Sequence, residues 1–219
     1  MATDIAVSDD GLTYTYTLRT DVPWVHYNAE SGEVEPVKDC DGNYRYVTAK
    51  DFEYGIKRTV NPATASDYAF MVTGYVVGAA EYFSGTGTAD DVAVKALDDA
   101  TLEITYLKDI AINTMIPGIW VTYATPSWLI EGDTCTEAMA DRWIEAENIQ
   151  TYGPYAMKEW IHDDHMTIIR NPYWPDDIAT IPSAKIDEIS FPVYATSSAH
   201  AAYEAGELDG ISSVLNTEI

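Results

Sequence analysis

The clearest pattern in the chain is a strict alternation of apolar and polar residues over positions 12–19. Such a period of two is typical of a β-strand with one buried face. The pattern therefore predicts a half-buried strand. Residues 20–46 carry Pro, Gly, Asn and Asp at short intervals and predict a long irregular segment. The buried face of the strand would consist of Leu12, Tyr14, Tyr16 and Leu18.

A helix is predicted to follow this irregular segment, beginning near Val47. Thr48 suits the N-cap position, and Asp51 three residues later gives a weaker form of the capping box. Asn61-Pro62 should end the helix, because proline disfavours a helical residue before it. Its apolar face would consist of Ala49, Phe52, Ile56 and Val60.

The middle of the chain predicts shorter elements. A second helix is expected from near Ser66 through Val72, with Gly74 and Gly78 interrupting the region beyond it. Residues 92–97 and 101–106 predict two strands of a hairpin around an acidic turn.

Residues 110–124 are largely apolar but contain Pro117 and Gly118, so we expect a broken helix there. Another short helix should follow Pro126.

The second half predicts a hairpin, one more strand and one more helix. Residues 155–160 and 166–170 alternate and would pair as the hairpin. A turn-rich stretch at 171–175 precedes a strand at 185–194, and a short helix at 197–205 would end at Gly206. The fold class is therefore mixed α/β (α+β). It has no sequence repeat and only a weak β-α-β rhythm.

Charge narrows the classes of function. Among 219 residues there are 36 Asp+Glu and 12 Lys+Arg, and 12 − 36 gives a net charge of −24. A field this negative repels phosphate backbones and anionic lipid, so we expect neither nucleic-acid binding nor peripheral membrane binding. Aromatic residues make up 12% of the chain, a composition that forms a core and does not favour disorder.

The two ends of the sequence suggest part of a longer or processed protein. Residues 1–4 lack the basic start and apolar run of a signal peptide. No stretch approaches the roughly 18 apolar residues of a membrane helix, so no membrane insertion is expected. The alternative at this stage is a cytosolic protein.

Cys40 and Cys135 match no metal or redox motif. Both have polar, loop-like neighbours, unlike buried core cysteines. They are either a disulfide closing a loop of about 95 residues or two unrelated thiols.

Enzyme motifs are weak. The sequence His162-Asp163-Asp164-His165 could offer metal ligands, but it falls where a hairpin turn is expected, and turns collect aspartate for backbone reasons. The stretch 39–43 resembles a calcium loop, but its glycine is the fourth residue where the EF-hand needs it sixth. The twelfth residue is Lys50 where the EF-hand needs a bidentate glutamate. We therefore expect no catalytic residue, metal or cofactor.

Aromatic residues near Gly or Pro are more suggestive, because rigid rings at loop junctions can line a ligand cleft. The alternative is that they fill the core. The candidates are Tyr75, Tyr123, Trp128, Tyr152 and Tyr155.

Six segments, in order, together resemble a known family. It comprises the extracytoplasmic solute-binding proteins of ABC importers, family 5, of the oligopeptide- and dipeptide-binding type. Each segment alone is weak, but their shared order over residues 12–210 is specific. The segments are Val47-Thr48-Ala49-Lys50-Asp51-Phe52 with Ile56-Lys57-Arg58, then 61–68, 94–104, 153–160, Arg170-Asn171-Pro172-Tyr173-Trp174 and 203–209.

The resemblance implies a periplasmic-binding-protein-like II architecture in which two lobes close on a ligand. Residues 12–145 would form the extra small domain and residues 146–219 part of the first lobe, with the second lobe absent. The family implies capture of a peptide or similar small solute and delivery to the transmembrane subunits of an ABC permease. It also implies a periplasmic location or a cell-surface lipoprotein, whose signal sequence this chain lacks.

Candidate ligand-binding residues follow from two sources. Residues 151–154 resemble a stretch near the family's cleft, which points to Tyr152 and Asn148. Tyr75 and Trp128 come from the loop aromatics. Two insertions relative to the family, at about 25–46 and 135–140, hold Cys40 and Cys135, which favours the disulfide.

Two alternatives stay open. One is a family member that binds nickel, haem or an oligosaccharide instead of peptide. The other is a metal-dependent hydrolase that uses His162 and His165.

Overall fold

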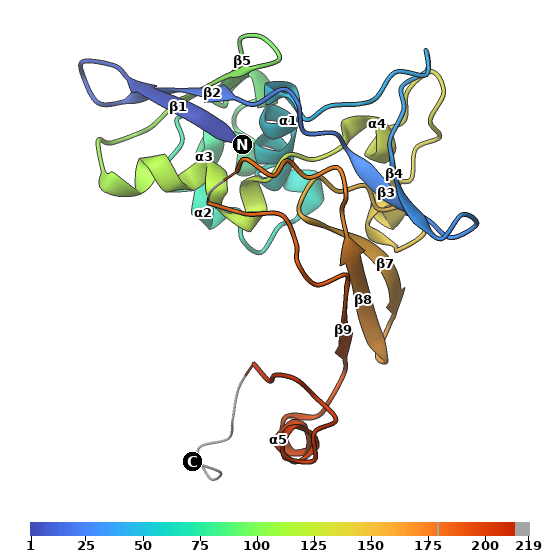
Figure 1. The fold of residues 1–219 in the computed structure, drawn as a ribbon. Helices are drawn as coiled ribbons and strands as arrows, with labels where there is room; N and C mark the ends of the chain where they lie inside the picture. The colour runs from blue at the N-terminus through green and yellow to red at the C-terminus, as the bar shows by residue number, and fades with distance from the viewer. Residues whose placement is uncertain (179, 213–219) are drawn as a thin grey trace.

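The computed structural model describes residues 1–178 and 180–212, and its first half is built on a four-stranded antiparallel sheet (Figure 1). The strands lie in the order β1-β2-β6-β5. Their bounds are Ala2–Val7 (β1), Thr13–Leu18 (β2), Val94–Ala96 (β5) and Thr101–Thr105 (β6).

The register of this sheet explains its buried face. Tyr14 lies opposite Ile104, and Tyr16 lies opposite Leu102, so the alternating apolar residues of β2 and β6 share one side. All four of these side chains are buried. The strand expected at 12–19 and the hairpin expected at 92–106 are both confirmed. β1 was not predicted, since every one of its residues is exposed and its apolar positions give no clear alternation.

The predicted helix is confirmed as α1, Ala49–Thr59. The capping box is present, with the Asp51 carboxylate accepting from the backbone N–H of Thr48 at 2.8 Å. α1 packs on β5 and β6 and on a 3₁₀ turn, η4 (Trp120–Thr122). The Thr59 hydroxyl donates to the Val121 carbonyl, which ties the end of the helix to that turn.

Gly55 is where α1 approaches this segment most closely. A Cβ added there would collide with the Tyr123 carbonyl oxygen and lie 2.8 Å from Oγ1 of Thr125. We therefore expect Gly55→Ala to lower the free energy of unfolding by about 2 kcal/mol, as overpacking commonly does. Gly118→Ala is the matched control, since a Cβ at Gly118 meets nothing within 4 Å. Urea denaturation of both variants tests this, and equal stability of the two would contradict the close packing.

The helix expected from Ser66 to Val72 is wrong in its bounds. The structure has two short helices, α2 (Phe70–Thr73) and α3 (Ala79–Phe83). Gly78 separates them with a φ of 77°, a left-handed conformation that ends helical continuity and suits glycine.

The broken helix expected at 110–124 is two 3₁₀ segments. They are η3 (Ala111–Gly118) and η4, separated after Pro117 and Gly118. The short helix after Pro126 is α4, Ser127–Ile130. Three further 3₁₀ turns are η1 (Pro62–Thr64), η2 (Ala89–Asp91) and η5 (Ala140–Ile144).

The prediction that residues 20–46 are irregular throughout is wrong. They contain a two-stranded hairpin, β3 (Val25–Asn28) and β4 (Glu33–Pro36). Val25 and Thr151 also exchange backbone hydrogen bonds of 2.7 and 2.8 Å, which joins this hairpin to the second half of the chain. The strands are only four residues long and rich in polar residues, so period-two alternation is too short to detect.

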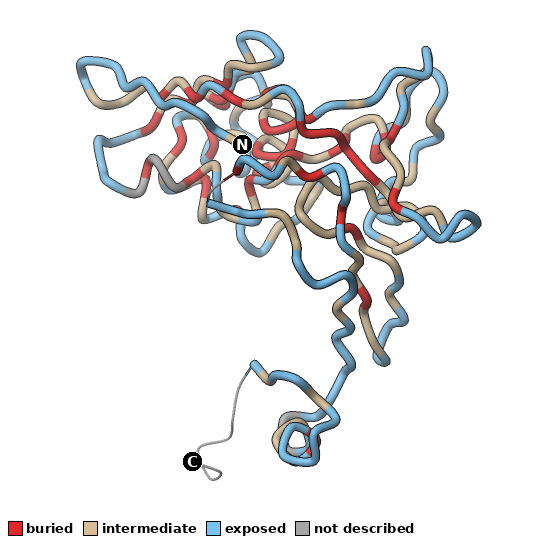
Figure 2. Tube along the Cα trace, in the orientation of Figure 1, coloured by how far each residue is buried: buried red, intermediate tan, exposed pale blue. Residues whose placement is uncertain are grey.

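The second half contributes a three-stranded antiparallel sheet and a helix. The strands are β7 (Tyr155–Ile161), β8 (His165–Arg170) and β9 (Glu188–Pro192), and the helix is α5 (Thr196–Glu204). The predicted hairpin, third strand and helix are thus confirmed, with a shorter strand. In Figure 1, α5 lies away from the main body, and Figure 2 shows that β9 and the described part of α5 are mostly exposed.

The main core crosses the expected domain boundary. Most of its members lie between Tyr14 and Ala124, and Trp174 and Ile178 from the second half pack into the same cluster. The indole Nε1 of Trp174 donates to the Ile181 carbonyl at 2.9 Å. The division of the chain into 12–145 and 146–219 stays a prediction.

Candidate functional site

Two of the four predicted site residues, Trp128 and Tyr152, belong to one aromatic cluster. Both rings make edge contacts with Trp24, with centroids 5.4 Å apart for Trp128 and 4.9 Å for Tyr152. Phe52 of α1 extends the cluster, 6.3 Å from Tyr152. The cluster therefore joins α1, α4, the residue before β3 and the segment before β7.

The polar groups of this cluster are already engaged. The Tyr152 hydroxyl accepts from the Ala124 N–H at 3.1 Å, and burial raises the pKa of this tyrosine. The Trp24 indole donates to the Asp51 carboxylate at 3.3 Å. Asp51 is 5% exposed, and burial raises its pKa against the lowering effect of its hydrogen bonds. The arrangement leaves few free donors or acceptors for a ligand.

Trp128 is held from two further sides. Its indole Nε1 donates to Gln150 Oε1 at 2.8 Å, and the Arg45 guanidinium lies over its ring, 4.6 Å from the centroid. Arg45 in turn forms an ion pair with Asp133, beside a disulfide between Cys40 and Cys135. The disulfide thus fastens the loop that positions Arg45 over Trp128.

The structure does not bring Tyr75 or Asn148 into this cluster. Tyr75 packs against the main core, and its carbonyl accepts from the Leu107 N–H at 2.7 Å. The Asn148 amide closes a turn by donating to the Arg142 carbonyl at 2.9 Å. The role of the four predicted residues in ligand binding therefore stays a prediction.

A second aromatic cluster lies on the surface, and the sequence did not point to it. We define the surface patch as Tyr68, Phe70 and Trp120, which are 47%, 62% and 57% exposed. Tyr68 is central, with its ring centroid 5.4 Å from that of Trp120 and 6.3 Å from that of Phe70. Contiguous exposed rings commonly mark binding surfaces.

One sequence signal could have indicated the patch. Tyr68 and Phe70 follow Asn61-Pro62, and Trp120 follows Pro117-Gly118. This is the same proximity to Pro and Gly that singled out Tyr75 and Trp128. The pairing of Tyr68 with Trp120, about 50 positions apart, however, requires the segment before α2 to lie beside η4.

The two histidines of the β7–β8 turn face different partners. His162 Nε2 lies 3.1 Å from Glu145 Oε2, whereas His165 lies 2.9 Å from Glu159 and 2.7 Å from Asp164. Within the described ranges, the one group with metal-ligand spacing is Cys40, Asp133 and Cys135. Its two sulfurs are joined in the disulfide and offer no thiolate.

The pKa of His165 is raised, first by its hydrogen bond to Glu159 and then by that to Asp164. Because the folded value lies above the unfolded value of about 6.5, the pair stabilises the folded chain fully below that pH. The contribution is lost as the pH rises through the folded pKa. Burial lowers the pKa of His26, so we expect His165 to titrate at the higher pH in an imidazole NMR titration.

The variant Glu159→Gln should lower the pKa of His165 and leave that of His26 unchanged. A titration in which His165 loses its proton at or below the pH of His26 would contradict the geometry of the turn.

The chain matches, over residues 1–219, the family model described as bacterial extracellular solute-binding proteins, family 5. The fold is that of periplasmic oligopeptide-binding proteins: the structure of Haemophilus influenzae OppA in complex with RPPGFSPFR superposes with a TM-score of 0.76 at 25% identity, covering 95% of this chain and 36% of that one.

The chain belongs to this family. It is 30% identical over 220 residues to the dipeptide-binding protein DppE of Bacillus subtilis (strain 168), covering 95% of this chain and 34% of that protein. It is 28% identical over 202 residues to the periplasmic oligopeptide-binding protein OppA of Escherichia coli (strain K12), covering 91% and 32%. The chain thus spans about a third of the length of these relatives.

None of the helices in the described ranges has the length and apolar character needed to cross a bilayer.

Proposed function

We propose that this chain is the part of an extracytoplasmic solute-binding protein that forms one wall of a peptide site. The proposal extends to the whole protein: capture of a peptide or similar small solute by closure of two lobes, and delivery to an ABC permease. The family and the peptide-binding relatives support it. In this account residues 12–145 are the extra small domain and residues 146–219 part of the first lobe.

The observation that carries the proposal is the surface patch. Tyr68 contacts both Phe70 and Trp120, and each of the three rings is about half exposed, so the apolar side chains of a peptide could cover them and bury apolar surface. A peptide bound to one lobe alone would keep its other side exposed to water. Closure of the second lobe would bury it and shift the population toward the closed state.

The four residues predicted from sequence are retained in a lesser role. Trp128 and Tyr152 would hold the shape of the wall through the buried cluster around Trp24. Asn148 and Tyr75 remain candidate contacts. The patch is the primary contact in this proposal.

The experiment uses the indole N–H signals of the six tryptophans, assigned by single Trp→Phe variants. The chain is titrated with acetyl-Ala-Leu-Ala-amide, a blocked and uncharged peptide. We expect a saturable shift at Trp120 that is larger than those at Trp24 and Trp128.

Tyr68→Ala should weaken this binding about fivefold, since an aromatic contact contributes roughly 1 kcal/mol. Tyr203→Ala is the matched control, because both tyrosines are 47% exposed. Shifts confined to Trp24 and Trp128, or equal losses in the two variants, would overturn the assignment of the patch.

A further inference from the structure

Arg58 differs from the other arginines in having no carboxylate partner among the described residues. Of the five in the chain, Arg19, Arg45, Arg142 and Arg170 each pair with a carboxylate, whereas Arg58 forms no ion pair with any described residue. The lysines that also lack an ion pair in the described ranges are all exposed, but Arg58 is half-buried. In a chain with three acidic residues for every basic one, an unpaired half-buried guanidinium needs an explanation.

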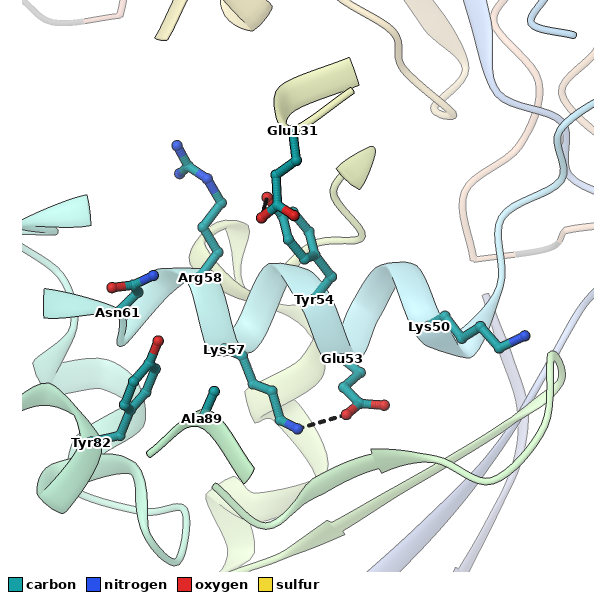
Figure 3. Close-up of a pocket in the computed structure, with 9 residues that line it drawn as sticks. All are labelled: Lys50, Glu53, Tyr54, Lys57, Arg58, Asn61, Tyr82, Ala89 and Glu131. Carbon is teal, nitrogen blue, oxygen red and sulfur yellow. Dashed lines mark hydrogen bonds and ion pairs between the residues drawn. The ribbon is translucent and has the colours of Figure 1, made fainter. Parts of the chain in front are cut away.

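Arg58 lines a hollow of about 390 Å³ that runs along α1 (Figure 3). The guanidinium lies over the Trp143 ring, 5.9 Å from its centroid, and interacts with the Tyr54 hydroxyl. Aromatic contacts on a guanidinium leave its in-plane N–H groups available. A guanidinium carries five N–H donors, so the contact with Tyr54 holds the side chain and leaves other donors available.

Other donors in the hollow are free as well. Asn61 uses its Oδ1 to cap the following turn at Ala63, at 2.9 Å, so its Nδ2 is the group left over. Among the described residues nothing accepts from Asn61 Nδ2 or from the Tyr82 hydroxyl. Figure 3 shows Asn61 and Tyr82 near the end of α1 that carries Arg58, with the guanidinium directed away from both.

The acidic groups of the hollow are already engaged. Glu53 accepts from Lys57 at 2.6 Å and from the Ala96 N–H at 2.7 Å, and Glu131 accepts from the Tyr54 hydroxyl at 2.8 Å. The lining also holds three basic residues, Lys50, Lys57 and Arg58. Lys50 pairs with Asp99 outside the hollow and Lys57 pairs with Glu53, so among the described residues Arg58 is the cation of the lining without a carboxylate partner.

We propose that this hollow binds a small carboxylate-bearing solute, with the carboxylate on the guanidinium of Arg58. A planar guanidinium presents parallel N–H donors that match a carboxylate. Asn61 Nδ2 and the Tyr82 hydroxyl supply further donors, and the volume suits a small molecule. The site is separate from the surface patch and does not rest on the proposed peptide function.

The test probes the chain with succinate and with the neutral analogue succinamide, at matched ionic strength near 150 mM. The indole N–H of Trp143 reports on the hollow, because its ring contacts Arg58. We expect succinate to shift the Trp143 signal saturably, succinamide to leave it unchanged, and the Trp120 signal to stay constant.

Three variants sharpen the result. Asn61→Asp keeps the capping oxygen but replaces the free donor with a negative charge, and Arg58→Gln removes the guanidinium. Each should weaken succinate binding at least about tenfold, the equivalent of roughly 1.4 kcal/mol. Lys108→Gln, which removes one exposed charge elsewhere, should change it less than about twofold, as screening at this ionic strength implies.

No saturable shift with succinate, an equal shift with succinamide, or unchanged binding in Asn61→Asp would each overturn the proposal. Should Arg58→Gln fail to fold, Asn61→Asp decides alone, because it retains the cap at Ala63. Failure here leaves the Trp120 experiment unaffected, so the two proposals are tested separately.

Discussion

Replacing both Cys40 and Cys135 with serine is expected to lower the free energy of unfolding by about 4–5 kcal/mol. The disulfide joins positions 95 residues apart, and a closed loop of this length restricts the unfolded chain strongly. Urea denaturation of the oxidised chain and of the double variant measures the difference.

Local contacts add to the expected loss. Asp133, beside Cys135, accepts from the N–H groups of Cys135 and Thr136 at 3.0 and 2.7 Å and pairs with Arg45. These interactions, the Cys135 N–H first, lower the pKa of Asp133 to about 2. Opening the disulfide would release the loop that keeps Arg45 over Trp128.

Reduction of the parent chain should reproduce the stability of the double variant, and the reductant should not affect that variant. A mass measurement that finds two free thiols under non-reducing conditions, or a stability change below about 0.5 kcal/mol, would contradict this role of the disulfide.

The second large effect is expected at Trp24. Its side chain is 1% exposed and forms the centre of the buried cluster, in contact with Trp128 and Tyr152. Trp24→Ala should lower the free energy of unfolding by about 3–5 kcal/mol, because it leaves a large cavity and removes the Asp51 hydrogen bond.

Trp120→Ala is the matched control. Trp120 is 57% exposed, so its loss should change stability by less than about 1 kcal/mol. A similar cost at both positions would mean that the surface patch is a structural element and weaken its assignment as a ligand surface.

Local patterns in the sequence predicted the elements that are long or strongly amphipathic. α1 was predicted with its cap and its end because Thr48, Asp51 and Asn61-Pro62 act within a few residues of one another. β2 was predicted because Tyr14, Tyr16 and Leu18 alternate on a strand with one buried face.

The errors share a physical cause. β1 is exposed throughout, and β3 and β4 are held by pairing with each other and with Thr151. Their formation depends on pairing with other segments of the chain, and the periodicity of a single segment does not reveal its partners. For the same reason the surface patch, built from Tyr68 and Trp120, could not be assembled from the sequence.

The buried cluster contains two of the four ligand candidates predicted from the sequence. Sequence reasoning chose Trp128 and Tyr152 as ligand candidates, and the structure does place them together. Because their rings contact Trp24 and their polar groups are satisfied, we propose that they support the wall and do not themselves contact the ligand. Burial, which decides between support and contact, is a property of the folded chain.

We propose that this chain supplies one wall of a peptide site and that the rest of a longer protein completes it. Calorimetric titration of the chain with a mixture of tri- to pentapeptides tests this most directly. We predict no binding tighter than a dissociation constant of about 1 mM, or roughly −4 kcal/mol. A micromolar dissociation constant would show that the chain holds a complete site by itself and would contradict the account.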